Sequence, residues 1–366
     1  MLDPRHPRLA QVLVDYSLAI RPGDKPVIYS TPQGLPLIRE VYRHALRAGA
    51  YPTARLTHDD LLEIKLREGS DVQVSYLSDL DRQEIEHFDA RLHIIAEENT
   101  KALSGVAPEK MALYEQGQAP RMERMMERFG RGELRWCVTL FPTPAHAQDA
   151  GMSLPEYEEF VYGACLLDQD DPAEGWRSLA MEQQRIAAFL SRHDAIRIEA
   201  PETDITFRTA GRIWVSSDGH EDFPDGEVFT APIEESVKGT ISFSYPVVYG
   251  GRELKGVRLT FREGRAETVT ASEGQDLLEK VVDQDTGARF VGEVAFGLNY
   301  GIRQFTRSML FDEKIGGTVH LALGMAYPDS GGRNQSALHL DMLLGMGDGP
   351  VYADGELCYE AGRFIL

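Results

Sequence analysis

The sequence predicts an α/β N-terminal domain followed by a C-terminal domain of α+β class that is rich in β-strands. In the first half, short apolar runs alternate with amphipathic helical segments, whereas the second half shows period-two alternation. The length of 366 residues is typical of two domains. We expect residues 1–188 and 189–366 to form these domains.

A strand–helix–strand unit begins the first half. The run KPVIYS, residues 25–30, predicts a buried strand. The segment GLPLIREVYRHALRAGA then has apolar residues at helical spacing, and Gly49 is placed to end the helix. A second strand, YPTARL, follows so closely that the two strands should pair in parallel. No G-x-G-x-x-G follows the first strand, so a dinucleotide fingerprint is lacking.

Further strands are expected at residues 89–98 and 134–142, with a helix between them that Gly117 and Pro120 should interrupt. A helix at residues 171–193 closes this half. The segments after it alternate like strands with Gly and Asp turns between them, which favours local antiparallel pairing: AIRIEA, TDITFRTA, GRIWVSS, GTISFSYPVVY and GVRLTFREGRAETVTA.

The chain is acidic, with 38 Lys and Arg against 58 Asp and Glu and a net charge of −20. This field disfavours nucleic acids and anionic membranes, but it does not repel amines or divalent cations. The three scattered cysteines indicate a reducing compartment. The N-terminus lacks the apolar core of a signal peptide, and no run is long enough to span a membrane. We therefore expect a cytoplasmic protein.

Two polar residues interrupt the apolar run ALHLDML near the C-terminus. If this run is a strand, His339 and Asp341 share one face, and Leu338, Leu340 and Met342 share the other. One face would then pack into a core while the other presents nitrogen and oxygen ligands. A hydrogen-bonded core pair or an exposed sheet edge would give the same pattern.

Three more polar residues lie in apolar surroundings of the same half: Glu227, Glu293 and His320. Taken alone, each glutamate is typical of a carboxylate at a strand edge, and the histidine is typical of a buried core residue. Together the five side chains supply three carboxylates and two imidazoles, and buried charges need partners or metals. This donor set suits zinc, cobalt, manganese or iron(II). Three carboxylates exceed the usual needs of one catalytic zinc, which favours a two-metal site.

Four ordered segments carry a resemblance to a known family: PDGEVFTAP, TGARFVGEVAFG, LFDEKIGGTVHLALGMAY and GGRNQSALHLDMLLG. The sequence resembles the aminopeptidase T and aminopeptidase S family of thermophile-type metallo-aminopeptidases. The resemblance implies removal of N-terminal amino acids from short peptides with a free N-terminus, by a pair of zinc, cobalt or manganese ions. It also implies an N-terminal α/β domain, a β-rich catalytic domain, and a homodimer that encloses a cavity.

The resemblance also implies roles for single residues. The metal ligands fall on Glu227, Glu293, His320, His339 and Asp341, with Glu293 as the bridging carboxylate. Tyr327 corresponds to the tyrosine that assists catalysis, and Glu313 is a looser match to an acidic residue of the family. Either Glu293 or Glu313 is the general base. The sequence departs from the family in having a short segment between Tyr327 and His339, and two extra residues before His320, which affects the expected shape of the substrate cavity.

Two other functions use the same residues. A ring-cleaving dihydroxypyridine dioxygenase shares the fold of this family and holds one iron(II) with two histidines and an aspartate. His320, His339 and Asp341 could form such a triad without further ligands. The presence of Glu227 and Glu293 argues against a mononuclear site. A non-catalytic metal-binding or peptide-binding protein is the third alternative. The number of metal ions per chain separates the first two functions.

Overall fold

The computed structural model describes residues 3–366, which form two compact units. The first unit runs to Ala173 and also includes the later segment Gly219–Pro224. The second unit consists of Glu174–Asp218 and Asp225–Leu366. The predicted boundary after residue 188 differs from this division, because it falls inside helix α9 (Pro172–Leu190). Ile186 and Leu190 of that helix belong to the core of the second unit. The alternating pattern that is typical of strands therefore begins after α9, some way beyond the boundary between the two units.

A five-stranded parallel sheet forms the centre of the first unit, and all four strands that the sequence predicts there are present. Its order is β2 (Thr53–Leu56), β1 (Pro26–Ser30), β3 (Ala90–Ile95), β4 (Arg135–Leu140) and β8 (Asp222–Phe223). The fifth strand, β8, was not predicted, because only two residues of the returning segment pair with β4.

The helices of the first unit are α1 (Arg5–Val12), η1 (Leu13–Ser17), η2 (Pro32–Gly34), α2 (Leu35–Arg47), α3 (Asp59–Glu68), α4 (Asp71–Ser75), α5 (Asp79–His87), α6 (Pro108–Gly130), α7 (Pro144–Asp149) and α8 (Leu154–Ala164). The prediction that Gly117 and Pro120 interrupt α6 is wrong, since the helix runs through both. Gly117 has a packing role there: a Cβ would lie 2.1 Å from the carbonyl oxygen of Ser75. The close contact between α4 and α6 thus requires glycine.

Two antiparallel sheets make up most of the second unit. The larger has the order β14 (Arg265–Thr270), β13 (Arg258–Arg262), β10 (Lys238–Ser242), β6 (Thr203–Arg208), β5 (Ala195–Ala200), β18 (Val351–Ala353), β19 (Glu356–Glu360), β20 (Arg363–Phe364). The smaller has the order β17 (His339–Gly345), β16 (Thr318–Gly324), β15 (Val291–Gly297), β9 (Glu227–Thr230), β7 (Val215–Ser217). A hairpin and short helices complete the unit: β11 (Val247–Tyr249), β12 (Arg252–Leu254), α10 (Gln275–Val282), α11 (Met309–Asp312) and η3 (Pro328–Ser330).

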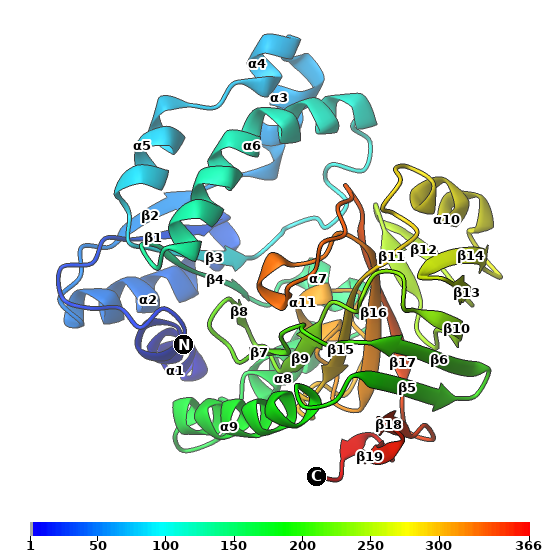
Figure 1. Cartoon of the computed structure of the whole chain (residues 1–366). Helices are drawn as coiled ribbons and strands as arrows, with labels where there is room; N and C mark the ends of the chain where they lie inside the picture. The colour runs from blue at the N-terminus through cyan, green and yellow to red at the C-terminus, as the bar shows by residue number, and fades with distance from the viewer. Residues whose placement is uncertain (1–2) are drawn as a thin grey trace. The chain divides into compact units, whose positions relative to one another are not determined.

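One hydrophobic core joins both sheets of the second unit to α9 and α10. The predicted fold class, an α/β part followed by a β-rich part, is confirmed, and Figure 1 shows the strands concentrated in the second half of the chain. Across residues 3–366, no helix is both long and apolar enough to cross a membrane.

Candidate metal centre

The smaller sheet of the second unit places the five predicted metal ligands on four neighbouring strands. Glu227 lies on β9, Glu293 on β15 and His320 on β16, whereas His339 and Asp341 lie on β17. These strands are adjacent in the order β17-β16-β15-β9, so residues far apart in sequence become neighbours.

The register of the strands puts all five side chains on one face. Asp341 pairs with Ala322, and Ala322 pairs in turn with Glu293. His320, two residues before Ala322, therefore points to the same side. Ala322, which stands between these two carboxylates, is fully buried. The sheet thus presents oxygen and nitrogen ligands close together on one face.

The opposite face of the same strands belongs to the hydrophobic core. Leu338, Leu340, Met342 and Leu344 all pack there, together with Leu321 of the neighbouring strand. The alternation predicted from ALHLDML therefore has a physical basis, because Leu340, Met342 and Leu344 anchor the strand that presents His339 and Asp341.

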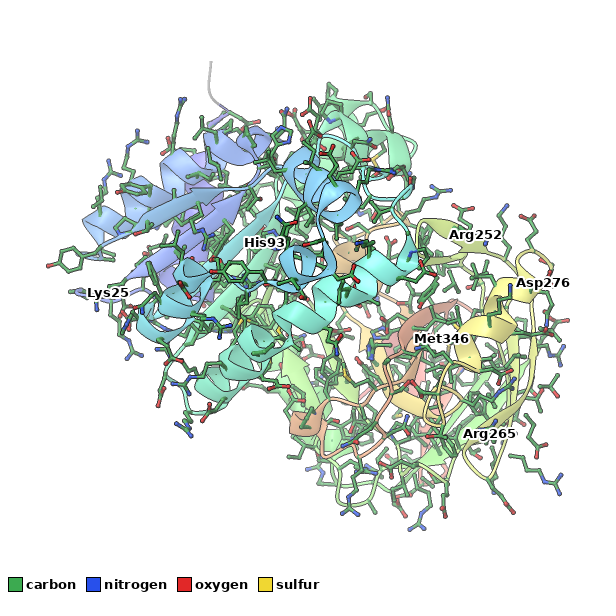
Figure 2. The ribbon with its side chains drawn as sticks, turned by 90° about the horizontal axis from the view of Figure 1, so that it is seen from above. Lys25, His93, Arg252, Arg265, Asp276 and Met346 are labelled. Atoms are coloured by element: carbon green, nitrogen blue, oxygen red, sulfur yellow. The ribbon has the colours of Figure 1, made fainter. Side chains whose placement is uncertain are left out.

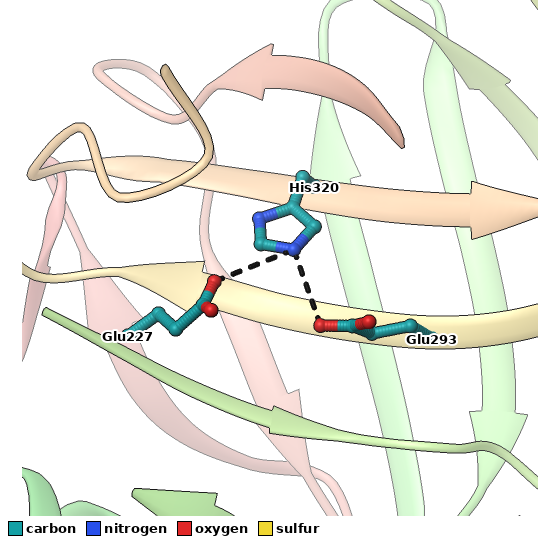
Figure 3. Close-up of side chains that lie close together, drawn as sticks. All are labelled: Glu227, Glu293 and His320. Carbon is teal, nitrogen blue, oxygen red and sulfur yellow. Dashed lines mark hydrogen bonds and ion pairs between the residues drawn. The ribbon is translucent and has the colours of Figure 1, made fainter. Parts of the chain in front are cut away.

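Glu293 lies between two imidazoles. Its Oε1 is 3.4 Å from Nε2 of His320, and its Oε2 is 3.4 Å from Nε2 of His339. Nε2 of His320 is also 3.5 Å from Oε2 of Glu227, as Figure 3 shows. On the other side, Nε2 of His339 is 3.5 Å from Oδ1 of Asp341. Glu293 therefore belongs to two ligand groups, one with Glu227 and His320 and one with His339 and Asp341.

Backbone carbonyls orient both histidine rings. Nδ1 of His320 lies 3.1 Å from the carbonyl oxygen of Glu313, and Nδ1 of His339 lies 2.9 Å from that of Met325. A carbonyl oxygen only accepts, so each Nδ1 carries the proton and donates it. Each Nε2 is then directed at the carboxylates, which is the usual arrangement for a metal-ligating histidine.

The electrostatics of the cluster follow from crowding four acidic groups with two imidazoles. Burial and the charge of Glu313 raise the pKa of Glu227 well above its usual range. Burial alone would raise the pKa of Glu293, but hydrogen bonds with His320 and His339 outweigh it and lower the pKa to about 2.

The imidazoles shift in the opposite direction. Burial alone would lower both pKa values. However, the hydrogen bond with Glu293 and the nearby carboxylates raise the pKa of His320 to about 10, and those with Asp341 and Glu293 raise that of His339 to about 11. Such perturbed values are typical of functional sites. In the absence of a metal, the cluster therefore holds protons on its imidazoles.

The surroundings of two buried carboxylate oxygens indicate whether the cluster is suited to a cation. Oε2 of Glu227 and Oδ1 of Asp341 are buried, and in the described residues each faces an imidazole Nε2 at 3.5 Å rather than a hydrogen-bond donor in good geometry. A carboxylate oxygen buried in this way is unfavourable unless a charge or donor compensates it. Carboxylate oxygens mixed with imidazole nitrogens are the ligands of zinc, cobalt and manganese. The residues thus fit divalent cations.

The two remaining predicted residues lie at the edge of the cluster. A carboxylate oxygen of Glu313 lies within 4.8 Å of ligand atoms of His320 and Asp341. The ring of Tyr327 packs edge-on against His339, with 5.0 Å between ring centroids, and 40% of the residue is exposed. Burial raises the pKa of its phenol.

Lys314 is a charged neighbour of the site that sequence reasoning missed. Its side chain is fully buried and its ammonium pairs with the carboxylate of Glu313. Its charge also acts on Glu227. A lysine that follows two acidic residues, as in FDEKIGG, is typical of a solvated turn. The sequence therefore does not distinguish this buried lysine from an exposed one.

Comparison with known proteins shows the family to which the chain belongs. The family described as thermophilic metalloprotease (M29) matches residues 3–364, so the chain belongs to this family. It is 28% identical to aminopeptidase T of Thermus thermophilus over 98% of both chains. It is also 27% identical to aminopeptidase 2 of Geobacillus stearothermophilus, over 96% of this chain and 97% of the other. Aminopeptidase T of Thermus aquaticus is 30% identical over 70% of each chain.

Solved structures show the same fold. Wild-type AmpT from Thermus thermophilus matches with a TM-score of 0.87, covering 99% of both chains at 24% identity. The 2,5-dihydroxypyridine dioxygenase from Pseudomonas putida KT2440 matches with a TM-score of 0.60 and 14% identity over 98% of this chain and 96% of the other. The predicted family and enzyme class, metallo-aminopeptidase, are confirmed.

Proposed function

We propose that the chain removes N-terminal amino acids from short peptides with a free N-terminus, using a pair of zinc, cobalt or manganese ions. The observation that carries this proposal is the position of Glu293, whose two oxygens face two separate ligand groups. A mononuclear iron(II) triad of His320, His339 and Asp341 gives Glu227 and Glu293 no ligand role, so the dioxygenase alternative is less well supported.

Glu227, Glu293, His320, His339 and Asp341 would hold the divalent cations, which when bound would supply an activated water and polarise the scissile carbonyl. The chain must also provide a base for the proton of that water. Both oxygens of Glu293 are directed at imidazoles, so we assign proton transfer to Glu313, whose carboxylate lies at the edge of the cluster. Lys314, buried beside it, holds this carboxylate in place.

Tyr327 and the acidic groups act on the substrate. The ring of Tyr327 is fixed against His339 and Phe229, and its protonated hydroxyl can donate to the oxygen that gains charge during attack on the peptide bond. The α-amine of the substrate is a cation, and a carboxylate of the site can bind it. The net charge of −20 adds a favourable field for that amine.

A paired substrate panel tests the proposed activity. Leucyl and arginyl amides should be hydrolysed by the metal-loaded protein, whereas the same amides with an acetylated amine should not, because acetylation removes the cation. Binding of the free amides without turnover would instead support a peptide-binding protein.

The assembly and location belong to the same proposal. We propose a homodimer in the cytoplasm, which the resemblance to the family and the sparse, unpaired cysteines support. The molar mass in solution, measured by light scattering, tests the dimer: a value of one chain, about 41 kDa, would contradict it.

A further inference from the structure

A second group of charged residues lies in the first unit, on one face of its parallel sheet. Parallel sheets normally bury apolar residues on both faces. Here Arg55, Tyr29 and His93 form one cross-strand row over β2, β1 and β3, and Arg91 stands two residues before His93 on the same face. Figure 2 labels His93 in this unit. Basic side chains are therefore unusual on this face of the parallel sheet.

These residues line a pocket of about 310 Å³ beneath helices α3, α5 and α6. The helices add Lys65, Tyr114 and Arg121 to its wall. A neighbouring pocket of about 290 Å³ shares Arg91 and Arg121 but is otherwise largely apolar, with Met122, Met125 and Trp136 in its wall. The two volumes are within the range of small-molecule sites.

The charges of this pocket are only partly balanced. Arg55 is neutralised, since its guanidinium pairs with Asp81 at 2.8 Å and with Glu84 at 2.7 Å. Arg121 makes no hydrogen bond or ion pair with any residue between 3 and 366. Lys65 donates to the carbonyl of Tyr76 and has no carboxylate partner among the described residues.

Arg91 is the most confined of these cations. Its guanidinium lies 4.6 Å from the ring centroid of Tyr29 and donates to the sulfur of Met125. Its Nε is buried and has no hydrogen-bond partner in the described part of the chain. Burial, followed by the charge of Arg121, lowers the pKa of Arg91 to about 10. Arg91 and Arg121 thus repel each other, and the carboxylates that act on Arg91, those of Glu84 and Asp81, are already paired with Arg55.

We propose that this pocket binds an organic phosphate, with the phosphate between Arg91, Arg121 and Lys65 and an apolar body over Met125 and Trp136. Arg55, Lys65, Arg91 and Arg121 carry four positive charges against the two negative charges of Asp81 and Glu84, and the excess of two matches a dianion. Arginine forks match phosphate oxygens. The tyrosine rings and the methionines supply surface for an aromatic body. All the lining residues lie in the first unit, so the proposal does not depend on the proposed peptidase activity.

Calorimetry with phenyl phosphate on the full-length, metal-loaded protein tests this proposal. Phenyl phosphate should bind saturably, and more tightly than inorganic phosphate or benzoate, because only phenyl phosphate offers both the dianion and the ring. Arg121→Gln should weaken its binding at least about tenfold, the scale of one charge-assisted contact. Arg124→Gln is the matched control, since Arg124 lies on the same helix but pairs with Glu86 and Glu127 at the surface.

Turnover of leucyl amide and the melting temperature should be unchanged in Arg121→Gln, which separates this pocket from the metal centre and from loss of folding. The proposal is overturned by the absence of saturable binding, or by equal affinity of Arg121→Gln and the unmodified protein. Equal affinity for inorganic phosphate and phenyl phosphate would overturn the role of the apolar wall.

Discussion

Glu293 is the residue on which the metal centre depends most. Its two carboxylate oxygens lie 3.4 Å from Nε2 of His320 and 3.4 Å from Nε2 of His339, and the residue is buried. Glu313 stands at the edge of the cluster, where its carboxylate lies within 4.8 Å of ligand atoms of His320 and Asp341 and pairs with Lys314. The two carboxylates should therefore respond differently to substitution.

Glu293→Ala should abolish hydrolysis and lower the metal content of the purified protein, because in the proposed two-metal site this carboxylate would serve both ions. Glu313→Gln should keep the metals and lose turnover, since a glutamine amide cannot take the proton of the attacking water. Metal analysis by plasma mass spectrometry alongside amide hydrolysis checks both, with Glu267→Ala, an exposed glutamate of β14, as control. Normal metal content and turnover in Glu293→Ala would show that the assignment is wrong.

Tyr327→Phe should retain metal and reduce kcat by about two orders of magnitude, the usual scale for losing one oxyanion donor. Phenylalanine keeps the ring contacts with His339 and Phe229, so folding should be unaffected. KM should change little, because the donor acts mainly in the transition state. If steady-state kinetics give an unchanged kcat, Tyr327 is a packing residue.

Metal binding should release protons. The pKa values of about 10 for His320 and 11 for His339 mean that both rings are protonated at pH 7 in the metal-free protein. A ring that ligates through Nε2 must lose that proton, so about one proton per imidazole should be released and affinity should rise from pH 7 to 9. Titration calorimetry in two buffers of different ionisation enthalpy measures this. A binding enthalpy that does not depend on the buffer would contradict it.

The same shifts bear on the stability of the metal-free protein. Because the folded pKa values are raised above the unfolded value of about 6.5, the two imidazoles contribute stability that is fully present below pH 6.5. That stability is lost as the pH rises through 10 and 11.

Sequence reasoning succeeds at this scale where alternation is strict. His339 and Asp341 share a face with apolar neighbours on the other, and the strand β17 realises that pattern. It fails for Lys314, because the burial of this residue depends on the packing of a short turn after α11 rather than on any local pattern.

At the scale of elements, the site depends on the register of three strands. Ala322 stands on β16 between Glu293 of β15 and Asp341 of β17, and it is fully buried. A larger side chain at Ala322 would displace the two carboxylates, whereas a substitution on the other face of the same strand would not.

Ala322→Leu should weaken metal binding by at least about tenfold, because added methylenes displace the carboxylates on either side. Leu321→Met is the control, since Leu321 belongs to the core face of β16 and the change conserves volume. Metal affinity and melting temperature should be measured for both. An Ala322→Leu protein that melts normally and binds metal normally would show that this row of the sheet does not position the metal ligands.

The predicted strands of both units are present, because a short apolar run between turn residues determines a strand locally. The helix α6 shows where local rules fail: Gly117 and Pro120 disfavour a helix, but packing against α4 keeps it continuous. The strand β8 was missed for a related reason. Its two residues pair with β4 from more than eighty positions away in the chain, a contact that no local pattern encodes.

At the scale of the whole molecule, the chain combines a metal centre in the second unit with an acidic surface charge. A dimer that encloses a cavity, as the resemblance implies, would admit only short or unstructured peptides. In such a dimer, the short segment between Tyr327 and His339 would widen the entrance to the cavity.

Di- to oligopeptides with a free α-amine should be cleaved one residue at a time, and their N-acetylated forms should not. Folded proteins should resist even where their N-termini are flexible, for steric reasons. Mass spectrometry of the products, with each free peptide as the control for its acetylated form, checks this. Internal cleavage of acetylated peptides would exclude exopeptidase action.

The central claim is that a pair of metal ions, joined by Glu293, carries out the hydrolysis. A stepwise titration of the metal-free protein with zinc, cobalt and manganese, following leucyl amide hydrolysis and bound metal together, tests it most directly. We expect activity to reach its plateau at about two bound ions per chain, as a two-metal site requires. A plateau at one ion, or activity that needs iron(II) and consumes oxygen, would contradict the account.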